Sequence, residues 1–240
     1  TYGGQVADAT CFAEVIPMIR RRLGELGRDL ESLTIVYDKG NVSRANQKLV
    51  DQAPLHYVTA IPNTSQPKLL AEANAALSLV DLGDGQSVSA YRARKRIWAV
   101  ERTVVVLVSE RLRDGQMRGI LQHVASARRW LDDLANTLGR GKQKRNRARI
   151  ERDIELRLKG RQHRSRVLHF QLTGDDPNLA LTYQFDQAAF DDLAQNILGR
   201  IVLMTDRHHW STAEIIQAYR NQADIEAVFA HLKDPIHLAL

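Results

Sequence analysis

The stretch "LTIVYDKGNVSRANQKLVDQAPLHYVTAIP", residues 33–62, decides the fold class of this chain. It opens with a short β-branched and aromatic run, residues 33–37, and closes with a second run, residues 56–62, that ends in proline. Both runs are typical of buried strands. Between them, residues 43–53 predict a short helix that begins at Ser43, a favourable capping residue. A strand, a helix and a strand in so short a stretch predict a parallel α/β unit.

Asp38 follows the first of these strands directly, with Gly40 behind it. Open α/β sheets place ligand-binding groups at the carboxyl ends of their strands, so Asp38 is a candidate site residue. An aspartate in a turn also caps the chain that follows, and this alternative stays open.

The pattern continues on both sides of this unit. Helices are predicted over residues 10–26, 111–138 and 147–159 and from Ser211 onward, and strands over 103–109, 166–172, 179–186 and 200–206. Ser211 and Glu214 form a plausible capping box. The α/β pattern changes at residue 83 and resumes near residue 199. We therefore expect an α/β core made of residues 1–82 and 199–240, with residues 83–198 as an insertion that has its own strands and a basic helical hairpin.

Length and composition agree with a folded protein. The chain has 240 residues, of which 44% are hydrophobic, so it can bury a sizeable core. Its single cysteine, Cys11, excludes an internal disulfide framework and suits a reducing compartment; packing is the expected role of that thiol. The apolar runs are too short or too charged to cross a bilayer. We expect a cytoplasmic protein.

Charge is concentrated in one segment. The net charge is +6, and residues 139–166 hold twelve Lys and Arg against three acids, a local excess of nine. A solvated charged helix and a phosphate-contacting surface both explain this segment, and charge alone does not separate them.

The helix near the C-terminus, "YRNQADIEAVFAHLKDP" (219–235), carries a polar row. Tyr219, Glu226 and Lys233 are spaced by seven residues, which returns a helix to within about 20° of the same direction. Gln222 lies one turn before Glu226 on nearly the same edge. Such a row is either a solvated face or the edge of a site.

This segment resembles the Tyr-Arg-Glu-Lys signature of DDE-type transposases from bacterial insertion sequences. Tyr219, Glu226 and Lys233 match the tyrosine, glutamate and lysine, whereas Gln222 stands where the signature has arginine. The segment "IVYDKGNVSRAN" resembles the second aspartate motif of the family, which assigns that role to Asp38. "TYGGQVADATCF" and "GRIVLMTDRHHWSTAEIIQAYR" resemble flanking parts, so the resemblance spans nearly the whole chain.

The resemblance implies a ribonuclease-H-like mixed sheet flanked by helices, with a large α+β insertion between Asp38 and the glutamate helix. Asp38 and Glu226 would be catalytic and would bind two Mg²⁺ ions, which Mn²⁺ can replace. The first acid of the triad is expected upstream of residue 1, so the 240-residue fragment alone is expected to be inactive. The DNA-binding residues implied are, in chain order, Lys39, Arg44, Tyr219, Gln222 and Lys233.

The expected function is Mg²⁺-dependent phosphodiester hydrolysis and strand transfer at insertion-sequence ends, by a homodimer or higher multimer in the bacterial nucleoid. A truncated or domesticated DNA-binding remnant and a ribonuclease-H-like nuclease are the alternatives.

Other polar residues are weaker candidates. Asp206 ends a strand and could bind metal or stabilise a helix start; His208 and His209 suit surface or capping roles, and Asp8 has no visible partner.

Overall fold

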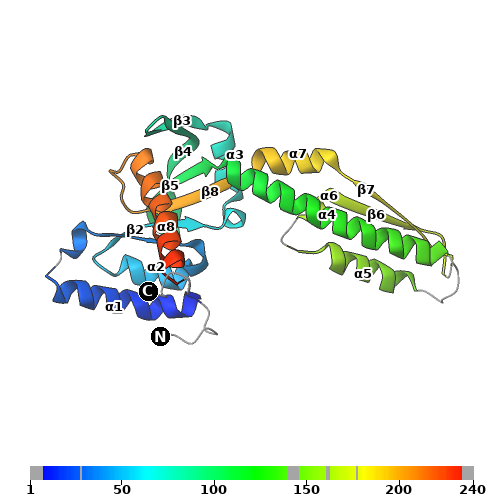
Figure 1. The fold of residues 1–240 in the computed structure, drawn as a ribbon, viewed down its shortest axis with the longest axis horizontal. Coiled ribbons are helices and arrows are strands. Elements are labelled where there is room, and N and C mark those ends of the chain that lie inside the picture. Colours follow the sequence, from blue (N-terminus) through cyan, green and yellow to red (C-terminus); the bar gives the residue numbers. More distant parts are fainter. Residues whose placement is uncertain (1–7, 28, 140–145, 161–162, 177, 234–240) are drawn as a thin grey trace. The chain divides into compact units, whose positions relative to one another are not determined.

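The fold is taken from a computed structural model, which describes residues 8–27, 29–139, 146–160, 163–176 and 178–233. Within these ranges, side chains are described between residues 14 and 222. The chain forms two compact units (Figure 1): unit 1 holds the residues up to Val108 and from Arg200 onward, and unit 2 holds Ser109–Gly199. Each unit is described by itself.

Unit 1 is built on a six-stranded mixed sheet with the order β1-β2-β8-β5-β4-β3. The strands are β1 (Thr34–Tyr37), β2 (His56–Ile61), β3 (Ser78–Gly83), β4 (Gln86–Ile97), β5 (Val100–Val108) and β8 (Arg200–Thr205). The helices are α1 (Asp8–Glu25), α2 (Arg44–Asp51), α3 (Pro67–Ala75) and α8 (Thr212–Lys233), with short 3₁₀ turns η1 (Leu30–Ser32), η2 (Lys39–Asn41) and η3 (Asn63–Ser65). The predicted α/β class is confirmed.

The strand–helix–strand unit predicted from residues 33–62 is present. β1 and β2 pair in parallel, with Thr34 opposite His56, and α2 connects them. The hydroxyl oxygen of Ser43 accepts a hydrogen bond from the backbone N–H of Asn46 at 3.0 Å, so Ser43 caps α2 as expected. Every other pairing in this sheet is antiparallel.

Alternating side chains give the sheet two apolar faces. On β5, Val104 and Val106 belong to the first core cluster, and Val105 and Leu107 belong to the second. Helices α1, α2 and α3 cover the first face with buried side chains, namely Ile16, Val50, Leu69, Leu70 and Ala73. Helix α8 covers the second face with Ile215 and Ile216. The core of unit 1 is therefore two apolar layers separated by the sheet.

Helix α8 begins at the predicted capping box. The backbone N–H of Ser211 donates to Glu214 at 2.6 Å, and the N–H of Glu214 donates to the Ser211 hydroxyl at 3.2 Å. The helix contacts both edge strands, β1 and β3. One helix reaches both edges of a six-stranded sheet because the sheet curls around it.

A buried polar network ties the first face together. Arg102 on β5 is 1% exposed, and its guanidinium donates two hydrogen bonds to the Asp51 carboxylate, at 2.9 and 2.7 Å. Arg102 also donates to the hydroxyl of Tyr57. Gln47 donates to Asp51 at 2.9 Å and accepts from the Tyr37 hydroxyl at 2.6 Å. Burial raises the pKa of both tyrosine hydroxyls, which therefore stay protonated: that of Tyr37 donates to Gln47, and that of Tyr57 accepts from Arg102.

Unit 2 pairs helices with a small hairpin. It contains α4 (Glu110–Gly139), α5 (Arg147–Leu158), α6 (Arg164–Val167), α7 (Gln187–Asn196) and the antiparallel strands β6 (Leu168–Thr173) and β7 (Ala180–Phe185). Its core has two parts: α4, α5 and the hairpin share one cluster, and α4, α6 and α7 share the other. The long helix, the basic helix and the two strands agree with the predicted elements.

The predicted boundary of the insertion is wrong at its start. Residues 83–108 were expected in the insertion, but β4 and β5 lie inside the main sheet, where β5 pairs with β8. The separate unit begins at Ser109. Helices α3 and α7 were also not predicted, although Pro67 at the first helical turn and Asp186 as a capping residue are ordinary start signals.

The buried Arg102–Asp51 pair is expected to contribute far more stability than the exposed pair Arg94–Glu101. Asp51→Ala leaves an uncompensated buried charge and should lower the free energy of unfolding by about 3–5 kcal/mol. Glu101→Ala, in a pair whose side chains are 46% and 70% exposed, should cost less than about 1 kcal/mol. Urea denaturation of both variants measures the difference, and equal losses would contradict the structural role assigned to Arg102.

Candidate functional site

Asp38 lies at the carboxyl end of β1, as predicted. Its side chain is exposed, and Oδ2 accepts a hydrogen bond from the N–H of Gly40 at 3.5 Å, which caps the turn η2. The strand before it is fixed, because the Thr59 hydroxyl donates to the carbonyl of Tyr37 at 2.8 Å. Asp38 is thus a weakly engaged carboxylate on a rigid strand end, so the capping role and a ligand-binding role are compatible.

Asp38 lies at the end of the strands where the chain passes from the sheet into unit 2 and back. β1, β2 and β5 run in one direction and β8 runs in the other. The chain leaves the sheet at Val108 and returns at Arg200, and these two residues are paired. The carboxyl ends of β1 and β5 therefore lie at the same end of the sheet.

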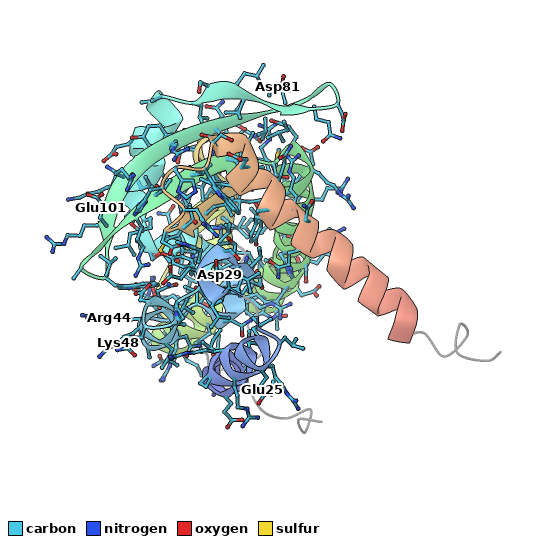
Figure 2. All side chains as sticks on the ribbon, turned by 90° about the vertical axis from the view of Figure 1, so that its left-hand side faces the viewer. Glu25, Asp29, Arg44, Lys48, Asp81 and Glu101 are labelled. Carbon is cyan, nitrogen blue, oxygen red and sulfur yellow. The ribbon has the colours of Figure 1, made fainter. Side chains whose placement is uncertain are left out.

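Two of the predicted DNA-binding residues follow Asp38 in the chain. Lys39 is exposed in η2, and Arg44 is exposed in the first turn of α2, one helical turn before Lys48 (Figure 2). The side-chain amide of Asn46 donates to the carbonyl of Asn41 at 2.9 Å, which joins the turn to the helix. These residues place positive charge on exposed positions near the strand end.

The predicted glutamate row lies on α8. Tyr219 is half-buried and packs against the second core cluster, and Gln222 is half-buried one turn later. Glu226 and Lys233 lie in the last part of the helix, and their side chains are outside the described residues. Helix α8 contacts β1, the strand that ends at Asp38.

Asp206 lies at the opposite end of the sheet from Asp38. Its Oδ2 lies 2.9 Å from Nδ1 of His56, and its Oδ1 accepts from the N–H of Tyr57 at 3.1 Å. Arg207 donates to Thr34 and to the carbonyl of Ser32, at 3.0 and 2.7 Å. Asp206 therefore joins β8 to the start of β2, and no local pattern in the sequence indicates that His56 is its partner.

The neighbouring histidines differ in their surroundings. Nδ1 of His208 lies 3.0 Å from the Thr103 hydroxyl. Burial, followed by the charge of Arg94, lowers the pKa of His208, so its neutral form is favoured. His209 is exposed, as expected for a surface residue. Asp8 and Cys11 lie in α1, where the side chains of residues 8–13 are outside the described part.

A divalent metal would need oxygen ligands beside Asp38. The Asp38 carboxylate has the donor chemistry that Mg²⁺ prefers. Among the residues whose side chains are described, no group of three His, Cys, Asp or Glu side chains could hold a metal ion. Asp38 fits a metal site only with acids from outside that set, and Glu226 is one such residue.

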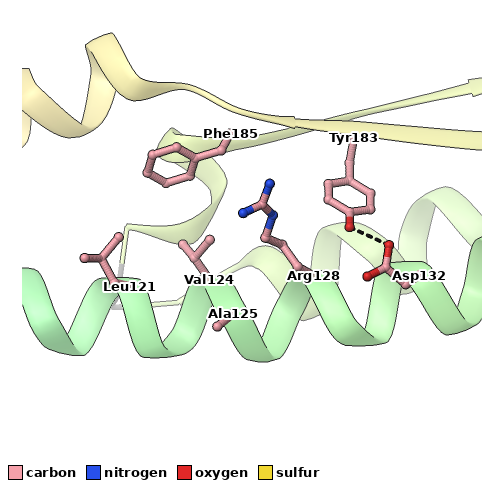
Figure 3. Close-up of a pocket in the computed structure, with 7 residues that line it drawn as sticks. All are labelled: Leu121, Val124, Ala125, Arg128, Asp132, Tyr183 and Phe185. Atoms are coloured by element: carbon pink, nitrogen blue, oxygen red, sulfur yellow. Dashed lines mark hydrogen bonds between the residues drawn. The ribbon is translucent and has the colours of Figure 1, made fainter.

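Unit 2 holds a cavity of about 420 Å³ between α4 and β7 (Figure 3). Arg128 lies 5.9 Å from the centre of the Tyr183 ring, and the Tyr183 hydroxyl donates to Asp132 at 2.5 Å. Leu121, Val124 and Phe185 supply apolar walls. The polar groups of this cavity already bind one another, so it is a weaker candidate than the edge at Asp38.

Comparison of the chain with protein-family models, with curated proteins and with solved structures gives no match. In the part of the chain that is described, no helix combines the length and apolar character that a membrane span requires.

The two aspartates at opposite sheet ends are expected to differ in their effect on stability. Asp206→Ala leaves the Tyr57 N–H and His56 without their acceptor and should cost about 1–3 kcal/mol in the free energy of unfolding. Asp38→Asn keeps the capping oxygen and should change it by less than about 0.5 kcal/mol. Chemical denaturation tests both, and a large loss for Asp38→Asn would make that residue structural.

Proposed function

We propose that this chain carries the catalytic core of a DDE-type DNA transposase, with Asp38 and Glu226 as two of its catalytic acids. One observation supports this most: α8, the helix of Glu226, packs against β1, the strand that ends at the exposed Asp38. Two acids 188 positions apart in the sequence are thereby carried by adjoining elements. The mixed sheet with helices on both faces agrees with the ribonuclease-H-like arrangement that the proposal requires.

The proposed roles follow from what each residue can do. Asp38 and Glu226 would supply carboxylate oxygens for Mg²⁺, together with the third acid that the transposase resemblance implies. Bound there, the metal would polarise the phosphodiester and supply an activated water. The chain's own contribution is rigid placement, since β1 is held by the Thr59 bond to Tyr37.

The basic and polar residues would position DNA. Lys39 and Arg44 follow Asp38 in the chain, are exposed, and would contact backbone phosphates. Lys233 would do the same as a point charge. Because the Tyr219 ring is half-buried against the core, a phosphate contact from it would use the hydroxyl. Gln222 offers hydrogen bonds without the charge and two-pronged grip of an arginine.

The connection of unit 2 supports the same proposal. Unit 2 is inserted between β5 and β8 at the sheet edge that holds Asp38. The chain order is therefore second acid, inserted unit, glutamate helix, as in the transposases that the sequence resembles. A remnant that only binds DNA, or a ribonuclease-H-like nuclease without strand transfer, would share this arrangement and must be separated by activity.

The decisive experiment uses the product of the whole reading frame that encodes residues 1–240, with a DNA duplex carrying the ends of the element. Glu226→Gln and Asp38→Asn should each abolish Mg²⁺-dependent cleavage, a loss of about 10³-fold or more, because each removes a carboxylate charge from the metal site. Binding of the duplex in the absence of metal should persist. Retained cleavage in either variant would exclude that residue.

Strand transfer separates the alternatives. Joining of the cleaved 3′ ends to target DNA supports a transposase, and nicking without joining supports a nuclease. DNA binding without either reaction, in the unmodified protein with Mg²⁺ or Mn²⁺, supports the remnant. Arg94→Gln serves as a matched control, because it removes an exposed charge from the sheet end opposite Asp38 and should leave cleavage unchanged.

A further inference from the structure

The cations of residues 139–166 that the structure describes fall into two groups according to what they contact. Four of them hold unit 2 together, namely Arg147, Arg157, Arg164 and Arg166. Arg147 is the clearest case, because its guanidinium donates to the carbonyls of Leu172 and Gly174 at 3.0 and 2.6 Å. Arg166 forms an ion pair with Asp192 on α7. These four charges are engaged within the fold.

Three other cations of the same segment have exposed side chains: Arg149, Arg152 and Lys159. Within the described residues, no ion pair or side-chain hydrogen bond engages any of these three side chains. Two acids adjoin Arg152 in the chain. Glu151 is already paired with Arg147 at 3.3 Å, and Asp153 is exposed. Some cations of the segment therefore form contacts within unit 2, whereas these three are exposed to solvent.

These three side chains share one face of α5. The buried face of the helix carries Ile150, Ile154 and Leu158, spaced by four residues. At about 100° per residue, Arg152 and Leu156 lie within about 20° of the direction opposite that face, and Arg149 and Lys159 lie within about 40° of it. We call Arg149, Arg152, Leu156 and Lys159 the outer row of α5. The row is about 15 Å long at about 1.5 Å per residue.

The composition of the outer row favours one kind of partner. A membrane-bound helix needs a broad apolar face, and the outer row has one exposed apolar side chain, Leu156, at 61% exposure. A protein interface needs an apolar or aromatic centre, which one leucine does not supply. A nucleic-acid backbone needs only cations in a line. In duplex DNA the nucleotides of one strand follow one another at about 3.4 Å along the helix axis, so a row of about 15 Å spans roughly four of them.

We propose that the outer row of α5 binds the phosphodiester backbone of DNA without regard to base sequence. The choice of DNA as the polyanion rests on the proposed function, and the row adds a surface separate from the carboxylates of Asp38 and Glu226. Arg149, Arg152 and Lys159 each contact a phosphate, and Leu156 packs against the sugars between them. Arg147 and Arg157 hold α5 against the hairpin and against α4.

The test measures metal-free binding of the whole-frame protein to a short DNA duplex of arbitrary sequence over a range of salt concentrations. The triple variant Arg149→Gln, Arg152→Gln and Lys159→Gln should reduce the slope of log affinity against log salt by roughly 3, about one per phosphate contact. Affinity near 0.1 M salt should fall at least about tenfold. The thermal midpoint should not move, because the three side chains are exposed and form no ion pair or hydrogen bond with the described residues.

A matched control removes the same charge from another face of unit 2. Arg111→Gln, Arg118→Gln and Arg129→Gln on α4 are exposed positions that should leave the slope almost unchanged. Equal losses in the two triple variants would mean diffuse charge and would overturn the proposal, as would an unchanged slope in the α5 variant. Loss of binding to anionic lipid vesicles with intact DNA binding would also overturn it.

The same assay separates this proposal from the proposed function. Asp38→Asn should bind the duplex with the slope of the unmodified protein, since no metal is present. If the outer row contributes as expected but the protein neither cleaves nor joins DNA with Mg²⁺, the surface stands and the transposase proposal fails.

Discussion

The buried guanidinium of Arg102 is the constraint on which unit 1 depends. A charge that is 1% exposed must be neutralised and hydrogen-bonded inside the protein. Its partners come from separate elements, because Asp51 ends α2 and Tyr57 lies on β2. Gln47 extends the network to Tyr37 on β1. These bonds form only when α2, β1, β2 and β5 lie close together, so the network adds a requirement that apolar packing alone does not impose.

The same network fixes the position of β1, the strand that ends at the candidate site. Tyr37, the last residue of β1, is fixed by its hydroxyl in the network and by its carbonyl on Thr59. Asp38 follows it with a single weak bond to Gly40. A rigid strand end that carries an almost unengaged carboxylate is suited to binding a ligand, because little must be rearranged when the ligand arrives. Asp206, at the other end of the sheet, instead has both carboxylate oxygens in hydrogen bonds, one with His56 and one with the N–H of Tyr57.

The two units use charge differently. In unit 1, arginines join elements: Arg102 is buried, and Arg92 donates to the carbonyls of Trp210 and His208 at 2.5 and 2.8 Å, which fixes the loop before α8. In unit 2, part of the basic segment holds the fold and part faces solvent in the outer row of α5. A count of charges in residues 139–166 does not show which cations hold unit 2 together and which face solvent. That depends on carbonyl and carboxylate partners from distant parts of the chain.

Local patterns in the sequence determined the β1–α2–β2 unit, the Ser43 and Ser211 caps and the turn position of Asp38, because caps and periodicity act over a few residues. Tertiary structure alone decided that residues 86–108 join the main sheet, that β8 lies between β2 and β5, and that Asp206 pairs with His56. Strand partners are chosen by burial of whole faces and by long-range groups such as Arg102, and no local period encodes that choice.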